Sequence, residues 1–539
     1  MDFEEDIWGP GIDRYSRNFD LHPRNVLEGE DDQTSGNSEL PLLPTLELAV
    51  CSQPFDPSNY SYDTAKQSFT RATKMVRNYM AQSRRKIFDT YYGFLCIRHL
   101  MQLLCLSVLR ETNDLSFLDS LHGNVSWVKL SQAISVRALQ KASDIIPTNS
   151  SQSVRQYSTL PFSGFGWDNS GVERDGLFLS SILWADRAAF LRLSVEGLLP
   201  GFSVFLLALL RMLPTKSEKD LHQQCVYVQD LALRHYLVGS KLDRSVLQLV
   251  AMFRGDRESS WKQQNRVVDQ DDSRRIAHAY TALLHVSQRD TSNVKVLSVD
   301  VMSRLNLFVF ATMRPPTPLS SLQLTTLVCA SINFFWLLLE HRPRISVLDW
   351  DDMMHYAGSI CTFATALEKL RILSEKDKAT FSKALGDADI HNLVGRTLLL
   401  VTLEVRMGSD SEEYVGLWED FLFAVDRISQ SAAYSLQFAP DHLPPAKADW
   451  LKVWEQIEVL WGLSIADKDM ASKVRQRVVD MRRTWDIIHL VLDDEIGSPR
   501  KCAYPRCFRP VATKRLLGAR WACEKCGNIA YCDRICQRA

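Results

Sequence analysis

The sequence Met470-Ala-Ser-Lys-Val-Arg-Gln-Arg-Val-Val-Asp-Met-Arg-Arg-Thr-Trp-Asp-Ile-Ile488 contains the clearest periodic pattern in the chain. Its apolar residues recur three or four positions apart, and Lys and Arg fill positions between them. Because an α-helix has about 3.6 residues per turn, this spacing gathers the apolar side chains on one face. The pattern predicts an amphipathic helix that ends before the triplet Gly497-Ser498-Pro499. Its apolar stripe consists of Met470, Val474, Val478, Met481, Trp485 and Ile488.

Helical periodicity of this kind extends back to Tyr62, where Phe69, Ala72, Val76 and Tyr79 are spaced three and four apart. No comparable run alternates polar and apolar residues between hairpin turns, as strands would. We therefore predict a mainly α fold, with a large multi-helix body over residues 62–495. No repeat of fixed period is visible, and an α-solenoid is one arrangement that the pattern allows.

Three polar segments interrupt the predicted helices. Residues 147–171 are rich in Ser, Thr, Asn and Gly, residues 254–275 are charged and rich in Gln, and residues 440–447 contain two adjacent prolines. The middle segment is the best candidate for a boundary. It divides the body into predicted halves at 62–253 and 275–495.

The overall composition is that of an ordinary globular protein, with 539 residues, 46% hydrophobic and 24% charged. A formal net charge of −1 excludes electrostatic binding of nucleic acid or membranes by the chain as a whole. The charge is nevertheless uneven. The first 40 residues contain eleven acidic and three basic side chains, whereas residues 500–539 contain ten basic and two acidic ones. The two ends are therefore expected to behave differently from the body.

Residues 1–60 are acidic and rich in Pro, Ser, Asn and Asp. Such a composition buries too little apolar surface to offset chain entropy, so we predict a disordered tail. Aromatic and apolar residues are interleaved with its carboxylates, which is also typical of acidic-hydrophobic activation segments. A solubilising tail is the preferred interpretation. The interleaved residues are Phe3, Ile7, Trp8, Tyr15 and Phe19.

The beginning of the chain lacks the basic and apolar regions of a secretory signal, so we expect an intracellular protein, with nucleus and cytoplasm both open. The core-like apolar run at residues 197–210 is shorter than the roughly 20 residues that span a bilayer, and it contains Pro200. A longer uncharged run at 315–339 carries polar residues and is interpreted as a buried helix. We predict no membrane span.

Half of the twelve cysteines fall within residues 502–539, in three closely spaced pairs. A tetrahedral zinc ion takes four thiolate or imidazole ligands, and short loops supply them two at a time. Six free thiols among Lys, Arg, Pro and Gly would have little apolar surface in which to be buried. The spacing therefore predicts Zn²⁺ binding by Cys502, Cys507, Cys523, Cys526, Cys532 and Cys536.

This pattern resembles a MYND-type zinc finger. In that family the first and third cysteine pairs bind one zinc ion, and the second pair binds another together with a downstream His and Cys. The resemblance covers residues 502–539 and implies a small cross-braced domain. It implies that the first ion is held by Cys502, Cys507, Cys532 and Cys536.

Two features depart from the family pattern. The first pair is separated by four residues, where the family usually has two, and the last His and Cys are absent. The finger is therefore expected to be either cut short or incomplete at its second site, for which this sequence supplies Cys523 and Cys526 as ligands. In a competing, sequential assignment these two cysteines join Cys502 and Cys507, and the third pair takes no part.

Other candidate sites are explained more simply by helix structure. Asp349 is interpreted as a helix N-cap followed by acidic residues, rather than as a site with His355. His222 with Cys225, and His278 with His285, share helix faces but lack further ligands. No phosphate-binding loop, dinucleotide fingerprint or hydrolase motif occurs. Some MYND proteins are methyltransferases with a SET domain, but its β-rich fold and cofactor motif are missing here, so we predict no enzyme activity.

The resemblance implies a protein–protein interaction adaptor, because MYND fingers bind short Pro-containing peptides. The implied partners are transcriptional co-regulators or ubiquitin-ligase components. The alternative is a nucleic-acid-binding regulator that contacts phosphates through basic residues of the tail. An enzyme with an unrecognised motif in the helical body is a third, less favoured hypothesis. The basic residues are Lys501, Arg506, Arg509, Lys514, Arg515 and Arg520.

Overall fold

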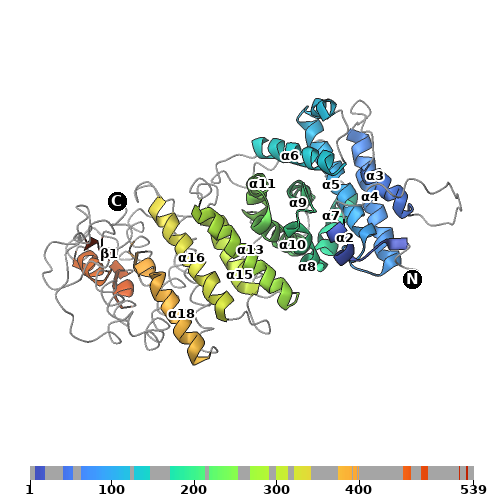
Figure 1. Ribbon diagram of the computed structural model, residues 1–539. Helices are drawn as coiled ribbons and strands as arrows, with labels where there is room; N and C mark the ends of the chain where they lie inside the picture. Colours follow the sequence, from blue (N-terminus) through green and yellow to red (C-terminus); the bar gives the residue numbers. More distant parts are fainter. Residues whose placement is uncertain are drawn as a thin grey trace. The chain divides into compact units, whose positions relative to one another are not determined.

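The structure is a computed structural model, and Figure 1 shows its ribbon. It describes residues 7–18, 40–51, 62–121, 127–145, 170–212, 218–252, 268–289, 299–312, 321–341, 374–390, 392–396, 399, 453–462, 475–476, 478–483, 521–522 and 530–531. The chain divides into two compact units, Met1–Ile276 and Ala277–Ala539. The division falls next to the boundary segment suggested by the sequence.

The described part of the first unit is helical. Its helices are α2 (Ile12–Asn18), α3 (Leu43–Cys51), α4 (Tyr62–Ser83), α5 (Tyr91–Glu111), the 3-10 helix η2 (Leu115–Leu121), α6 (Trp127–Ile145), α7 (Ser170–Ala185), α8 (Arg187–Val195), α9 (Phe202–Arg211), α10 (Glu218–Val238) and α11 (Lys241–Met252). The division between the units lies inside α13 (Gln270–Arg289).

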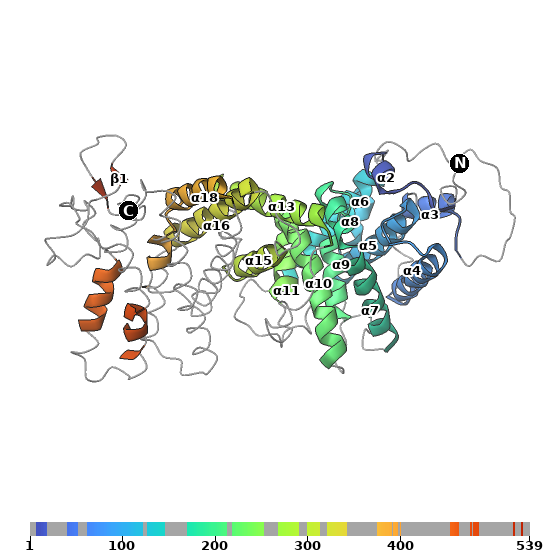
Figure 2. The same ribbon diagram turned by 90° about the horizontal axis from the view of Figure 1, so that it is seen from below.

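Helix α5 forms the centre of the first unit. It packs against α3, α4, α6 and α9, which surround it in both views (Figures 1 and 2). The helix begins where the Thr90 hydroxyl accepts a hydrogen bond from the Gly93 backbone N–H, at 3.4 Å. Residue 93 must be glycine, because a Cβ there would lie 1.9 Å from the Ile87 carbonyl oxygen.

Among the described residues, α5 alone is long and apolar enough to cross a membrane. In its most apolar 18-residue stretch, however, 89% is buried within the protein.

The described part of the second unit contains α15 (Val299–Thr312), α16 (Ser321–His341) and α18 (Glu375–Asp387), and the two strands β1 (Trp521–Ala522) and β2 (Ala530–Tyr531). Buried polar groups connect its helices. The Tyr280 hydroxyl of α13 contacts Asn306 of α15 and accepts a hydrogen bond from Ser331 of α16. The indole N–H of Trp336 donates to the Ala388 carbonyl, 3.1 Å away.

The prediction of a mainly α fold is confirmed for the described residues of the body, none of which lies in a strand. The predicted buried stripe is confirmed at Val478 and Met481, while its other four members lie outside the described residues. The buried helix predicted within 315–339 is also confirmed, because Phe334 and Trp336 of α16 are almost fully buried.

The prediction of disorder over residues 1–60 is wrong for two described segments, 7–18 and 40–51, which contain the helices α2 and α3. Several of their apolar side chains are buried, and partners far along the chain hold them: the Tyr15 hydroxyl donates to the Phe88 carbonyl, 73 positions away. Tyr15, for example, is 3% exposed. Local composition does not reveal such partners, which is the reason for the error.

The polar segment 254–275 is shorter than predicted, because α13 already begins at Gln270. Asp272 is buried there and pairs with Arg234 of α10, with a shortest N–O distance of 2.5 Å. The segment 147–171 is also slightly shorter, since α7 begins at Ser170.

Candidate functional site

The six cysteines predicted to bind zinc lie outside the described residues. The structure does describe the short antiparallel ribbon that β1 and β2 form, in which Trp521 pairs with Tyr531 and Ala522 with Ala530. In the sequence, Cys523 and Cys526 fall between the two paired strands, and Cys532 follows the second strand directly.

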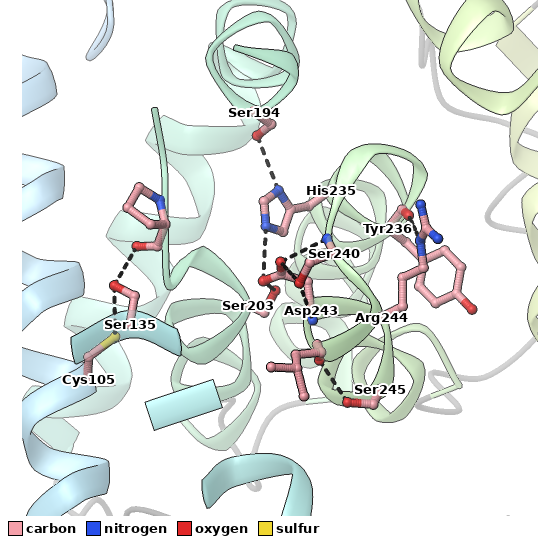
Figure 3. Close-up of polar contacts among 12 residues, drawn as sticks. Cys105, Ser135, Ser194, Ser203, His235, Tyr236, Ser240, Asp243, Arg244 and Ser245 are labelled. Atoms are coloured by element: carbon pink, nitrogen blue, oxygen red, sulfur yellow. Dashed lines mark hydrogen bonds and ion pairs between the residues drawn. The ribbon is translucent and has the colours of Figure 1, made fainter. Parts of the chain in front are cut away.

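Within the described residues of the body, polar side chains from four helices meet around His235, in the last turn of α10 (Figure 3). One ring nitrogen, Nδ1, lies 3.2 Å from the Ser194 hydroxyl of α8. The other, Nε2, lies 3.7 Å from a carboxylate oxygen of Asp243 in α11. The rings of Phe190 and Phe202 pack nearby, with centroids 6.0 Å and 5.6 Å from the imidazole.

Asp243 occupies this position because of how α11 begins. The Ser240 hydroxyl accepts a hydrogen bond from the Asp243 N–H, and the Asp243 carboxylate accepts one from the Ser240 N–H, 2.9 Å away. This reciprocal pair is a capping box, which satisfies backbone groups at the start of a helix. The other carboxylate oxygen accepts a hydrogen bond from Ser203 of α9, 2.6 Å away. Asp243 of α11 thereby connects its own helix to α9 and α10.

Burial alone would raise the pKa of Asp243. The nearby His235 and the hydroxyls of Ser203 and Ser240 outweigh this effect and hold the pKa below its usual value of 3.8. The carboxylate is therefore charged at neutral pH, with its oxygens occupied by hydroxyl and backbone donors.

Ser194, His235 and Asp243 are the residue types of a hydrolytic triad. Catalysis by such a triad would require an accessible serine and a carboxylate that is available to the histidine. A nucleophilic serine has to reach a substrate, whereas Ser194 is 7% exposed and His235 is 5% exposed. The Asp243 carboxylate is committed to the helix cap and to Ser203. We interpret the cluster as a polar connection between α8, α9, α10 and α11.

We expect Asp243→Asn to lower the free energy of unfolding by about 2–3 kcal/mol at pH 7, because the variant loses charge-assisted hydrogen bonds in a buried position. The folded-state pKa is lowered, so this contribution is present above pH 3.8 and is lost as the pH falls further. Denaturant unfolding at pH 7 and pH 3 measures it. The control is Asp271→Asn, an exposed carboxylate on α13. An equal loss at both pH values would contradict the prediction.

The remaining sequence candidates do not form a site among the described residues. Cys225 is buried, and burial raises the pKa of its thiol to about 11. His278 and His285 are both exposed on α13. Asp349 and His355 lie outside the described residues. No group of three His, Cys, Asp or Glu side chains in the described part could hold a metal ion.

Sequence reasoning missed the cluster around His235, because its residues are scattered over four helices. The only local signal was the spacing of Ser240 and Asp243, which fits a capping box. Comparisons of the chain with protein-family models, with curated proteins and with solved structures found no match.

Proposed function

We propose that the protein is an interaction adaptor whose C-terminal tail, residues 502–539, is ordered by zinc and binds short Pro-containing peptides of regulatory partners. The observation that carries the proposal is the set of three cysteine pairs in this tail, with the second pair lying between the paired strands β1 and β2. A short ribbon around a Cys-x-x-Cys turn is a common way to present two thiolates to one zinc ion.

The proposed assignment divides the cysteines between two sites, as the resemblance implies. Cys502, Cys507, Cys532 and Cys536 would hold one ion, and Cys523 and Cys526 would belong to the other.

The basic residues of the tail fit this proposal without nucleic acid. Four thiolates around one Zn²⁺ leave a local charge of about −2, which neighbouring Lys and Arg offset. The tail has a net charge of +8, from ten basic and two acidic residues in 500–539. The helical body would offer further docking surface, and we propose no catalytic activity for it.

The proposal predicts that peptide binding depends on zinc. The full chain should bind members of an array of 12-residue Pro-containing peptides, and should bind the matched Pro→Ala peptides at least about tenfold more weakly. Stripping the zinc with a chelator under denaturing conditions and refolding without metal, or the substitution Cys532→Ser, should abolish binding, because both remove the fold of the tail. Cys329→Ser, in the body, is the matched control.

Binding that survives zinc removal would contradict the proposal, as would equal binding of the Pro→Ala array. Binding of DNA or RNA with a steep salt dependence, without peptide binding, would favour the nucleic-acid alternative. Fluorescence polarisation at two salt concentrations separates these results.

A further inference from the structure

The N-terminal strap, defined as residues 7–18, packs on the surface of the first unit through side-chain and main-chain contacts, as a bound peptide would. Figure 1 shows its helix α2 beside the helices of the first unit. Trp8 packs edge-on against two tyrosine rings, with centroids 5.2 Å from Tyr79 of α4 and 5.4 Å from Tyr92 of α5. The two tyrosines stack on each other, 5.5 Å apart. Together they form an aromatic platform for the indole.

The backbone of the strap is also bound. Gly11 forms an antiparallel bridge with Thr90, and the Tyr91 N–H donates to the Pro10 carbonyl at 3.0 Å. Gly9 passes between two side chains at φ +74°, and a Cβ there would lie 3.0 Å from Cβ of Tyr91 and 3.2 Å from Leu43 of α3. Main-chain pairing of this kind is how extended peptides bind along an exposed backbone edge.

Tyr15 is the second aromatic anchor. Its side chain is 3% exposed, and its ring stacks on Phe94 with centroids 5.1 Å apart. Its hydroxyl donates to the Phe88 carbonyl, 2.6 Å away. The Phe88 N–H is in turn bound by Asp186, at 2.8 Å. Asp186 thus holds the backbone at Phe88 in place independently of the strap, and the Phe88 carbonyl is positioned to accept the Tyr15 hydroxyl.

An ion pair at the edge of this surface holds the one carboxylate of the strap, that of Asp13. Arg192 of α8 donates to Asp13 at 2.6 Å and to the Ser16 hydroxyl at 3.2 Å. Arg192 also donates to Glu196 of its own helix, at 3.2 Å. Buried aromatic anchors with a charged rim are typical of protein–peptide interfaces.

We propose that the surface formed by α3, α4, the start of α5 and α8 is a peptide-binding site that the strap occupies in cis. Its ligand in trans is a partner segment with two aromatic anchors spaced like Trp8 and Tyr15 and a carboxylate placed between them to pair with Arg192, as Asp13 does. The strap is tethered to α3 by residues 19–39, so its effective concentration at the site is high, on the order of millimolar. A partner therefore competes with the strap, and the strap keeps the site closed until a segment of higher affinity arrives.

The test separates the strap from the body after folding. A protease site is inserted between Glu30 and Asp31 of the full chain, the folded protein is cut, and the released fragment is diluted away. A fluorescent synthetic peptide of residues 1–20 is then titrated. We expect the cut protein to bind it with micromolar affinity, and the uncut protein to bind it at least about 30-fold more weakly because the tethered strap competes.

Peptide variants test the anchors. Trp8→Ala in the peptide should weaken binding at least about tenfold, because the indole fills the aromatic platform. Gly9→Ala should weaken it comparably, because a Cβ meets Tyr91 and Leu43. The matched control is Ile7→Ala, since Ile7 is 44% exposed, and its affinity should change less than about twofold.

A second variant guards against loss of the fold. In the uncut chain, the double substitution Trp8→Ala and Tyr15→Ala should leave the helical circular dichroism of the body intact and raise affinity for the labelled peptide to that of the cut protein. The proposal is overturned if both the cut protein and this variant lose their helical signal, since the strap would then be a core element. It is equally overturned if either stays folded and does not bind the peptide.

Discussion

Replacing Arg234 with alanine should lower the free energy of unfolding of the first unit by about 3–5 kcal/mol. The side chain is completely buried in α10. It donates to Asp230 at 2.6 Å and to both carboxylate oxygens of Asp272, at 2.5 Å and 3.0 Å. Removing the guanidinium leaves two carboxylates in the interior without their main partner. That penalty exceeds the cost of the lost packing alone.

The charge state supports this expectation. Burial by itself lowers the pKa of Arg234, but the charges and hydrogen bonds of Asp230 and Asp272 outweigh it and raise the pKa above the usual value. The guanidinium is therefore protonated at any pH at which the protein is folded. The loss should therefore follow from removal of the ion pair at neutral pH.

Arg274→Ala is the matched control. Arg274 lies on α13, two residues from Asp272, and pairs with Asp271 at the surface, where the side chains are 47% and 71% exposed. Surface pairs contribute little, so this variant should change stability by less than about 0.5 kcal/mol. Urea unfolding followed by circular dichroism measures both variants. Equal stability of the two variants would contradict the prediction.

The second large effect concerns the cysteines of the tail. Cys507→Ser and Cys532→Ser should each unfold the tail, because a structural zinc site contributes about 10–16 kcal/mol of apparent binding free energy and needs all four ligands. Cys523→Ser should do less damage. In the proposed assignment its site has two cysteine ligands, Cys523 and Cys526, and is expected to bind zinc weakly.

The competing sequential assignment predicts the opposite order. If Cys502 and Cys507 shared one ion with Cys523 and Cys526, Cys532→Ser would keep its tightly bound zinc and Cys523→Ser would lose it. Zinc content of the purified single variants, with Cys329→Ser as the control, decides between the two. The ribbon register is compatible with both assignments.

Helix content and its apolar faces were predictable from the sequence, because they follow from spacing within a few turns. The periodicity that placed Val478 and Met481 on one face is local, and both are buried. The strap was not predictable in the same way. Trp8 stood in a stretch of carboxylates, and its partners Tyr79 and Tyr92 lie more than 70 positions later in the chain.

The same distinction applies to the candidate sites. Cysteine spacing within 38 residues is a local pattern, so the zinc hypothesis could be formed from the sequence. The cluster of Ser194, His235 and Asp243 depends on how α8, α10 and α11 pack, and no local pattern encodes it. The ion pair between Arg234 and Asp272 is of this second kind, because its residues are 38 positions apart.

The central claim is that zinc orders the tail, and counting zinc in the purified full chain tests it most directly. After exhaustive dialysis against a chelator that removes surface-bound metal, we expect about one zinc ion per chain, since the proposed assignment gives one tetrahedral site four cysteine ligands. A value near zero in the freshly purified protein, with all six tail thiols open to alkylation, would contradict the account.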